Sequence, residues 1–239
     1  MSSFDNPLVV QWEYASEERL ATRDAAYRTL IEGTNAEEVA FEAVREVSPR
    51  RMLDVGCGTG EWADRVQHEL GTEVVAVDIS PRMVELGRAH GVDARTADAQ
   101  DLPFEDASFD CVAANWMLYH VPDVRRAIAE LGRVLEPGGR LVAGTFGEGN
   151  LSELWALVGM EPESGHSFSC TTGEELLWPV FTRVERREAV GTVVFPNAES
   201  VRRYIGATML RAHLATKVPE LDGPLRARSV HSVFVASKQ

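Results

Sequence analysis

Apolar residues recur along this chain with two different periods, and the alternation between them predicts its fold. Short apolar runs that stop at a glycine or an acid are typical of buried strands. Such runs occur at residues 52–55, 73–77 and 140–146, and further strands are expected at 111–115 and, with a weaker pattern, at 92–97. Helical spacing follows most of them; Trp62, Val66 and Leu70, for example, share one face of a helix expected over 61–70. Strands that alternate with helices predict a doubly wound, mostly parallel α/β sheet.

The segments before and after this alternating region have other patterns. Two helices are expected ahead of the first strand, one over 10–31 and one beginning at Asn35, where Glu38 completes a capping pattern. Beyond residue 147, the pattern predicts strand segments at 181–188 and 192–195, an amphipathic helix over 197–216, and an antiparallel edge strand over 230–236.

We therefore predict a single domain built on a seven-stranded sheet with one antiparallel strand. Its expected parts are an N-terminal helical cap (1–48), a core (49–147), a mostly helical lid (148–228) and a final strand (229–239).

Composition excludes several classes of function. The 239 residues include 24 basic and 37 acidic side chains, for a net charge of −13, and no basic block offers a surface for nucleic acid. Three separated cysteines without a C-x-x-C pair indicate a reduced, cytoplasmic protein without structural zinc. No apolar run approaches the roughly 20 residues of a membrane span. Composition leaves monomer and homodimer open.

The first strand ends in a glycine turn that predicts a ligand site. Gly56, Gly58 and Gly60 let the backbone turn with positive φ and lie close to a bound molecule. The spacing G-x-G-x-G differs from the dinucleotide fingerprint G-x-G-x-x-G. Asp54 stands two residues before the first glycine, where a carboxylate disfavours a pyrophosphate and favours a cationic ligand.

The segment from Asp54 to Gly60 resembles motif I of the class I S-adenosylmethionine (SAM) methyltransferases. SAM carries an ammonium group and a sulfonium, which suit an acid-bordered glycine turn. The segment Leu135–Leu141 closely resembles the structural motif that follows the methyl site in this family, and the resemblance covers about Leu53 to Phe146 with five motifs in order. The chain most resembles the small-molecule methyltransferases of ubiquinone and menaquinone biosynthesis.

Spacing and resemblance together give a set of cofactor residues. Asp78 lies 18 residues beyond Gly60 at a strand end, where an acid accepts hydrogen bonds from both ribose hydroxyls. The resemblance implies that an acid at Asp98 accepts from the adenine amino group and that N-terminal helices fold over the cofactor. The expected cofactor-binding residues are Tyr14, Arg23, Asp54, Gly56, Gly58, Asp78, Ile79, Met83, Asp98, Ala99 and Asn115.

Candidate catalytic residues follow the fourth expected strand. Tyr119 and His120 are the polar ring-bearing residues nearest the expected position of the methyl group, and an imidazole can take a proton from a substrate near neutral pH. Alternatively, His120 only bonds its own loop, and transfer proceeds by alignment of nucleophile, methyl and sulfur. The segment Asn115–Leu118 replaces the Pro-Pro-Tyr-type tetrapeptide of nucleic-acid amino methyltransferases, which argues against base methylation.

The predicted function is SAM-dependent methyl transfer to an oxygen, nitrogen or activated carbon of a small molecule, with S-adenosylhomocysteine as the product. Two alternatives remain at this point. One is a SAM-binding protein without catalytic activity. The other is a nicotinamide-dependent dehydrogenase, which has no need for Asp54 or Asp98.

Overall fold

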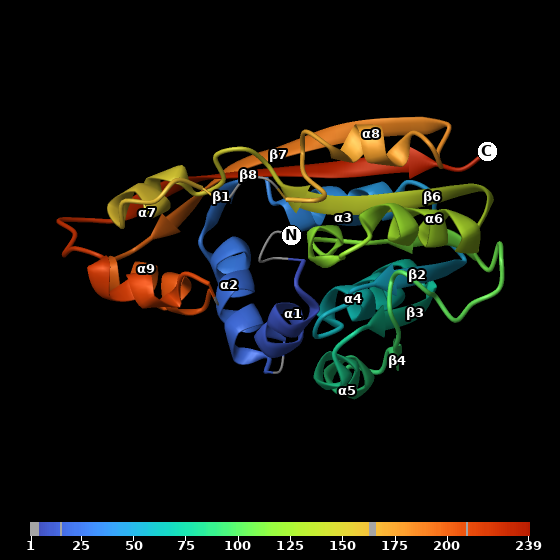
Figure 1. The fold of residues 1–239 in the computed structure, drawn as a ribbon, viewed down its shortest axis with the longest axis horizontal. Helices are drawn as coiled ribbons and strands as arrows, with labels where there is room; N and C mark the ends of the chain where they lie inside the picture. The colour runs from blue at the N-terminus through green and yellow to red at the C-terminus, as the bar shows by residue number, and fades with distance from the viewer. Residues whose placement is uncertain (1–4, 15, 163–165, 209) are drawn as a thin grey trace.

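The fold centres on one twisted sheet, which a computed structural model describes together with its helices for residues 5–14, 16–162, 166–208 and 210–239 (Figure 1). Among these residues the sheet has eight strands in the order β1-β7-β8-β6-β5-β2-β3-β4. Their bounds are β1 Ile31–Gly33, β2 Arg51–Val55, β3 Glu73–Asp78, β4 Asp93–Thr96, β5 Phe109–Ala113, β6 Leu135–Phe146, β7 Arg183–Phe195 and β8 Leu225–Ser237.

The doubly wound arrangement predicted from the sequence is confirmed. Strands β2 to β6 pair in parallel, and the strand order reverses between β2 and β5. Strand β8 pairs antiparallel with both β6 and β7. The eighth strand, β1, is an addition to the expected seven and pairs antiparallel with β7.

The C-terminal strands differ from the prediction in two ways. The two segments expected at 181–188 and 192–195 are one strand, β7, because Gly191 does not end it: a Cβ there would lie 2.9 Å from the carbonyl oxygens of Glu32 and Thr34. This glycine marks the close approach of β1 rather than a break. The last strand is not an edge strand; β8 lies between β6 and β7, and the four residues from Val233 to Ala236 are all buried, as in a strand covered on both faces.

The lid region holds less helix than predicted. Strand β7 runs through it, and the helix expected over 197–216 is a shorter α9 (Ala198–Gly206) followed by the 3-10 helix η2 (Ala212–Lys217). The other helices of this region are α7 (Ser152–Leu157) and α8 (Gly173–Leu177).

The N-terminal segment forms two helices where one was expected over 10–31. Helix α1 (Pro7–Glu13) ends just before Tyr14, and α2 (Glu18–Thr29) follows. The carbonyl of Tyr14 accepts a hydrogen bond of 2.8 Å from the Ser80 hydroxyl, so the chain between the helices is held against the end of β3. Helix α3 (Ala36–Arg45) begins after Asn35, as predicted, and the Asn35 side chain accepts a hydrogen bond from the Glu37 amide.

Helices cover both faces of the parallel strands (Figure 1). Leu53 of β2 belongs to a core that includes α6 (Val124–Val134), whereas the adjacent Met52 belongs to a core with α3 and α4 (Glu61–Leu70). Successive side chains of a strand point to opposite faces, so β2 is buried on both. Helix α5 (Pro81–Ala89) extends the second layer beside β3 and β4.

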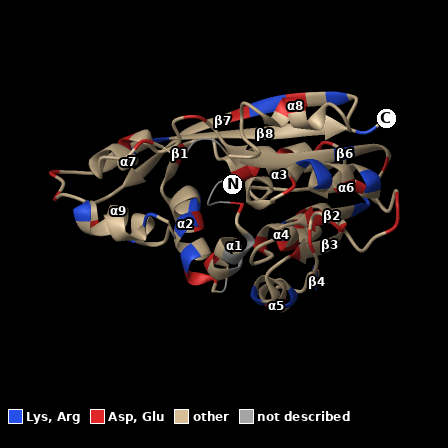
Figure 2. Cartoon of the chain, in the orientation of Figure 1, with Lys and Arg blue, Asp and Glu red and all other residues tan. Residues whose placement is uncertain are grey.

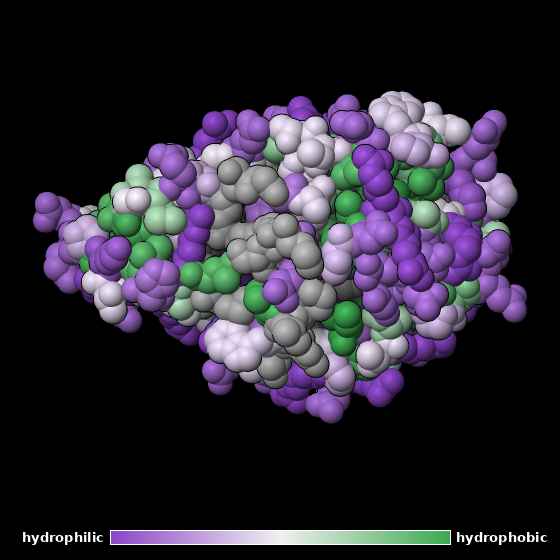
Figure 3. Space-filling model, viewed as in Figure 1, coloured by the Kyte–Doolittle hydropathy of each residue, from purple (hydrophilic) through white to green (hydrophobic). Residues whose placement is uncertain are grey.

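The surface is charged and mixed in sign. Acidic and basic positions are interspersed along the helices in Figure 2, and the face seen in Figure 3 is mostly hydrophilic with scattered apolar groups. Within the described ranges, no helix combines the length and apolar character that a bilayer crossing needs.

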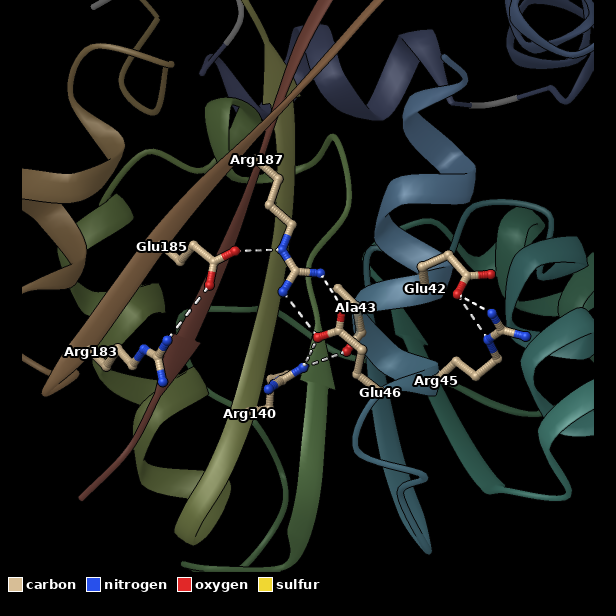
Figure 4. A network of polar contacts seen from close by, with 8 residues as sticks. All are labelled: Glu42, Ala43, Arg45, Glu46, Arg140, Arg183, Glu185 and Arg187. Atoms are coloured by element: carbon tan, nitrogen blue, oxygen red, sulfur yellow. Dashed lines mark hydrogen bonds and ion pairs between the residues drawn. The ribbon is translucent and has the colours of Figure 1, made fainter. Parts of the chain in front are cut away.

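A polar network fixes α3 to the sheet (Figure 4). Arg187 of β7 donates two hydrogen bonds, of 2.6 and 2.9 Å, to the carboxylate of Glu46. Arg140 of β6 donates to the same carboxylate and to the carbonyl of Ala43, near the C-terminus of α3. Hydrogen bonds from Arg187 are the largest cause of the lowered pKa of Glu46. Because Glu46 is partly exposed, we assign the network an orienting role rather than a large share of stability.

The first prediction concerns Gly60, which lies at the start of α4 and close to α5. Its φ is 81°, and a Cβ there would lie 2.6 Å from the Cα of Gly87 in α5. Gly71, at the other end of α4, has a φ of 68° and open space around a Cβ. We expect Gly71→Ala to lower the free energy of unfolding by about 1–2 kcal/mol from backbone strain alone. Gly60→Ala should lower it clearly more, because the helices must also separate.

Urea denaturation of both variants measures this difference. Equal losses in the two variants would show that the helix contact does not constrain the glycine turn.

Candidate active site

A cavity of about 490 Å³ opens at the carboxyl ends of β2, β3 and β5. Its volume lies in the usual range for small-molecule sites, roughly 300–1,000 Å³. It occupies the point where the strand order reverses, which is where open α/β sheets bind their ligands. Side chains of α2, among them Arg23 and Tyr27, line it opposite the strand ends.

Two carboxyl groups that affect each other electrostatically, those of Asp54 and Asp78, line this cavity. Asp78 accepts hydrogen bonds from the backbone N–H groups of Gly58, at 3.0 Å, and Ser80, at 2.8 Å. Asp54 is 3% exposed and has no hydrogen-bond donor among the described residues. Burial, with a smaller contribution from the charge of Asp78, raises the pKa of Asp54 to about 7. Burial also raises the pKa of Asp78 against the effect of its backbone bonds. A positive charge placed between the two would stabilise both carboxylates.

The next strand ends supply further polar groups. The Asp98 carboxylate accepts bonds from the backbone N–H and side-chain amide of Gln100, at 2.9 and 3.0 Å. Asn115, two residues beyond β5, has both its amide nitrogen and its amide oxygen buried without a partner in the described part of the chain. An unpaired buried amide costs free energy, which a ligand that bonds it would recover. Ala99 and Ile79 also line the cavity, and Ile79 is half exposed at its rim.

The candidate catalytic residues join an N-terminal side chain. The Tyr14 hydroxyl lies 2.9 Å from Nε2 of His120, which belongs to the 3-10 helix η1 (Leu118–His120). Burial raises the pKa of Tyr14 to about 12, so the phenol stays protonated at neutral pH. The ring of Tyr119 meets that of His120 edge-on at 4.5 Å between centroids, and burial raises the pKa of Tyr119 as well. All three rings line the cavity.

Three predicted cofactor residues have other surroundings than expected. Arg23 lines the cavity, but its guanidinium bonds Glu13 and, at 2.8 Å, the carbonyl of Ala207. Gly58 lies outside the lining and donates its N–H to Asp78, which it therefore positions. Met83 is fully buried in the core and does not reach the cavity, because its place in the first turn of α5 turns it toward the sheet.

The sequence reasoning missed a second group of lining residues. They are Asp24, Tyr27, Trp116, Phe146, Tyr204 and His231. One signal was present: Asp24 interrupts the apolar stripe of Leu20 and Tyr27 on α2. Burial raises the pKa of Asp24 to about 6. Tyr204 lines the cavity while only 7% exposed.

Comparison with known proteins agrees with this geometry. Residues 53–143 match the family described as a methyltransferase domain. A ubiquinone biosynthesis O-methyltransferase of Xanthomonas oryzae pv. oryzae is 37% identical over 123 residues, which are 48% of this chain and 51% of the relative. The 27-O-demethylrifamycin SV methyltransferase of Amycolatopsis mediterranei is 43% identical over 104 residues, covering 40% and 38% of the two chains. The chain thus spans about half the length, or less, of these curated relatives.

A solved structure extends the likeness to the whole chain. The phosphoethanolamine N-methyltransferase 2 of Haemonchus contortus, in complex with phosphomonomethylethanolamine and S-adenosylhomocysteine, superposes with a TM-score of 0.64. The sequences are 20% identical, and the match covers 100% of this chain and 60% of the other.

Fold and site together define a Rossmann-like α/β protein whose cavity is built at the carboxyl ends of its parallel strands. More particularly, residues 53–143 match a family of methyltransferase domains, in agreement with the resemblance to class I SAM methyltransferases that the motifs from Asp54 onward carry.

The raised pKa of Asp54 predicts a pH-dependent stability. Between about pH 4 and pH 7 the folded state holds this proton and the unfolded state has lost it, so wild-type stability falls as pH rises through that window. Asp54→Asn removes the titration. We expect the free energy of unfolding of the variant, relative to that of the wild type, to rise by roughly 2–4 kcal/mol between pH 4 and pH 8.

Urea denaturation at several pH values measures the difference in free energy of unfolding between the two proteins. Glu148→Gln, at an exposed acid, serves as the control, and its difference from the wild type should not depend on pH. A pH-independent difference for Asp54→Asn as well would mean that Asp54 is already ionised in the free protein.

Proposed function

We propose that this protein transfers the methyl group of SAM to an oxygen, nitrogen or activated carbon of a small molecule. The observation that carries the proposal is a pair of carboxyl groups at the strand ends of a region that matches a methyltransferase domain: Asp54, buried without a donor among the described residues, and Asp78, held by two backbone N–H groups. A cationic nucleoside supplies a positive charge that pairs with the Asp54 carboxylate. Its ribose supplies hydroxyl groups that can donate hydrogen bonds to Asp78.

The cofactor half of the cavity follows from these two residues. Asp54 would face the positively charged methionine portion, and Asp78 the ribose. Asp98 and Ala99 would bind the adenine edge, with Ile79 packed on the ring, and Asn115 would bond the methionine ammonium or carboxylate group. Each of these side chains lines the same cavity.

Catalysis would use the hydrogen bond between the Tyr14 hydroxyl and the His120 imidazole. Bound SAM supplies an electrophilic methyl group. Because His120 Nε2 lies 2.9 Å from the Tyr14 hydroxyl, a proton from the acceptor would pass to the Tyr14 oxygen while the Tyr14 proton passes to Nε2. Tyr119, buried against His120, would hold the imidazole in place.

The acceptor half is lined by aromatic rings, including Tyr27, Phe146 and Tyr204, and suits a small, largely apolar molecule rather than a nucleic acid. Two relatives methylate oxygen by their names, which favours oxygen as the atom methylated. Three free cysteines among the described residues support a cytoplasmic enzyme, and we expect a monomer or homodimer.

Titration with SAM and with NAD, followed by turnover of methyl-labelled SAM against a metabolite extract, tests the proposal. We expect saturable SAM binding, no NAD binding, and label in a small molecule. NAD binding without SAM binding would support a dehydrogenase, and SAM binding without turnover would support a silent binding protein.

Asp78 gives a specific prediction for cofactor binding. Asp78→Asn keeps the shape of the side chain but removes the charge that strengthens its bonds to two hydroxyl donors. We expect SAM affinity to fall by about 1–3 kcal/mol in calorimetry. Asp93→Asn, at an exposed acid on β4, is the control and should bind normally. Unchanged affinity in Asp78→Asn would remove this residue from the site.

His120 gives a prediction that separates catalysis from binding. We expect His120→Ala to lower turnover by about 100-fold while SAM affinity changes little, because the imidazole acts on the acceptor proton. Tyr14→Phe should lower turnover similarly, since it breaks the same chain. Wild-type turnover in both variants would leave methyl transfer to alignment alone.

A further inference from the structure

One histidine in the wall of the cavity holds a hydrogen-bond donor that nothing in the described chain uses. His231 lies on β8, directly opposite Phe146 of β6 and Ala189 of β7, and is 4% exposed. Three aromatic rings surround its imidazole at centroid distances of 5.1 Å for Tyr27, 5.3 Å for Phe146 and 5.7 Å for Trp116. These four residues all line the cavity, which places His231 in its aromatic half.

The contact with Trp116 fixes where the imidazole carries its proton. The indole Nε1 of Trp116 lies 2.9 Å from Nδ1 of His231. An indole N–H can only donate, so Nδ1 must accept, and the neutral ring must hold its proton on Nε2. Burial lowers the pKa of His231 to about 3, so the ring stays neutral at any working pH and cannot serve as a base.

The chain bears a conformational cost to keep this pair in place. Trp116 has a φ of 53°, a left-handed conformation that a bulky residue rarely adopts. The indole rests on Gly144 of β6, where a Cβ would lie 3.2 Å from the ring atoms. Strain of this kind persists where the surrounding structure uses it, and here it aims the indole at His231.

The Nε2 atom of His231 is buried and has no acceptor among the residues the structure describes. An unsatisfied buried N–H is costly, and a ligand oxygen that reached it would remove that cost. While Trp116 donates to Nδ1, Nε2 keeps its proton and cannot accept a hydrogen bond. Nε2 therefore favours a ligand oxygen, which accepts, over an N–H or ammonium group, which donates.

We infer that His231, with its tautomer set by Trp116, is a specificity-determining residue whose Nε2–H binds an oxygen of the methyl acceptor. The inference deepens the proposed function and rests on it: the substrate class it names is a largely apolar, ring-sized molecule with a carbonyl, ether or phenolate oxygen beside the methylated atom. Amines that present only donors are selected against at this position.

Nitrogen-detected NMR of protein labelled at histidine tests the first half in the free protein. We expect His231 to show a protonated Nε2 and an unprotonated Nδ1 throughout pH 5 to 8. A proton on Nδ1, or a charged ring in that range, would overturn the inference. This result does not depend on whether SAM or its product binds.

Two isosteric probes test the second half in the presence of S-adenosylhomocysteine. Acetophenone carries a carbonyl oxygen where α-methylstyrene carries a methylene group. We expect acetophenone to shift the Nε2–H signal and bind about 10-fold more tightly than α-methylstyrene. In His231→Phe, which keeps a ring in the same place, the two probes should bind equally.

Trp116→Phe is a second variant in case His231→Phe does not fold. It removes the donor to Nδ1, so the imidazole should populate both tautomers and the preference for acetophenone should fall several-fold. Equal binding of the two probes to the wild type, or an unchanged preference in both variants, would overturn the inference. Failure of S-adenosylhomocysteine to bind counts instead against the proposed function, and the NMR result stands apart from it.

Discussion

The site depends on two carboxyl groups at neighbouring strand ends, the buried Asp54 and the partly buried Asp78, whose charges oppose each other. Burial and mutual repulsion both oppose ionisation, and the pKa of Asp54 rises to about 7 as a result. Asp78 offsets part of this cost with backbone N–H groups of the glycine turn and of the following loop, whereas Asp54 has no such partner among the described residues. The two carboxyl groups therefore disfavour each other's ionisation, and the proposed cationic ligand would stabilise both charges.

Other features of the structure serve to hold this pair. Parallel pairing of β2 with β3 sets Asp54 beside Ala76 and brings Asp78 to the same edge of the sheet. The turn after β2 can follow its path because Gly56 and Gly60 take positive φ, and α5 closes on the turn at Gly87. The N-terminal segment then covers the opening, with Tyr14 bonded to Ser80 through its carbonyl and to His120 through its hydroxyl.

Much of the core could be predicted from sequence because its signals are local. Helix α4 occupies residues 61–70 as its apolar spacing indicated, and the strand ends at Asp54 and Asp78 border one cavity as their positions implied. Met83, predicted to bind the cofactor, is fully buried in α5 and lies outside the cavity lining, which proximity in sequence does not reveal.

The aromatic part of the cavity could not be predicted because its contacts join distant segments. His231 meets Trp116 across 115 positions and Tyr27 across about 200, and nothing local in the sequence marks either contact. The gap expected between the segments 181–188 and 192–195 is absent for a similar reason: Gly191 there packs against the backbone near Glu32, far earlier in the chain. Tertiary neighbours, not the pattern around each residue, decide these roles.

The claim that a cation relieves the buried acid pair is tested most directly by counting protons. Calorimetric titration with SAM at pH 6.5, in two buffers with different enthalpies of ionisation, gives the number released on binding. We expect the wild type to release roughly 0.5–0.8 proton more than Asp54→Asn, because a bound positive charge returns the carboxyl to its ionised form. The same proton count for both proteins would contradict the account.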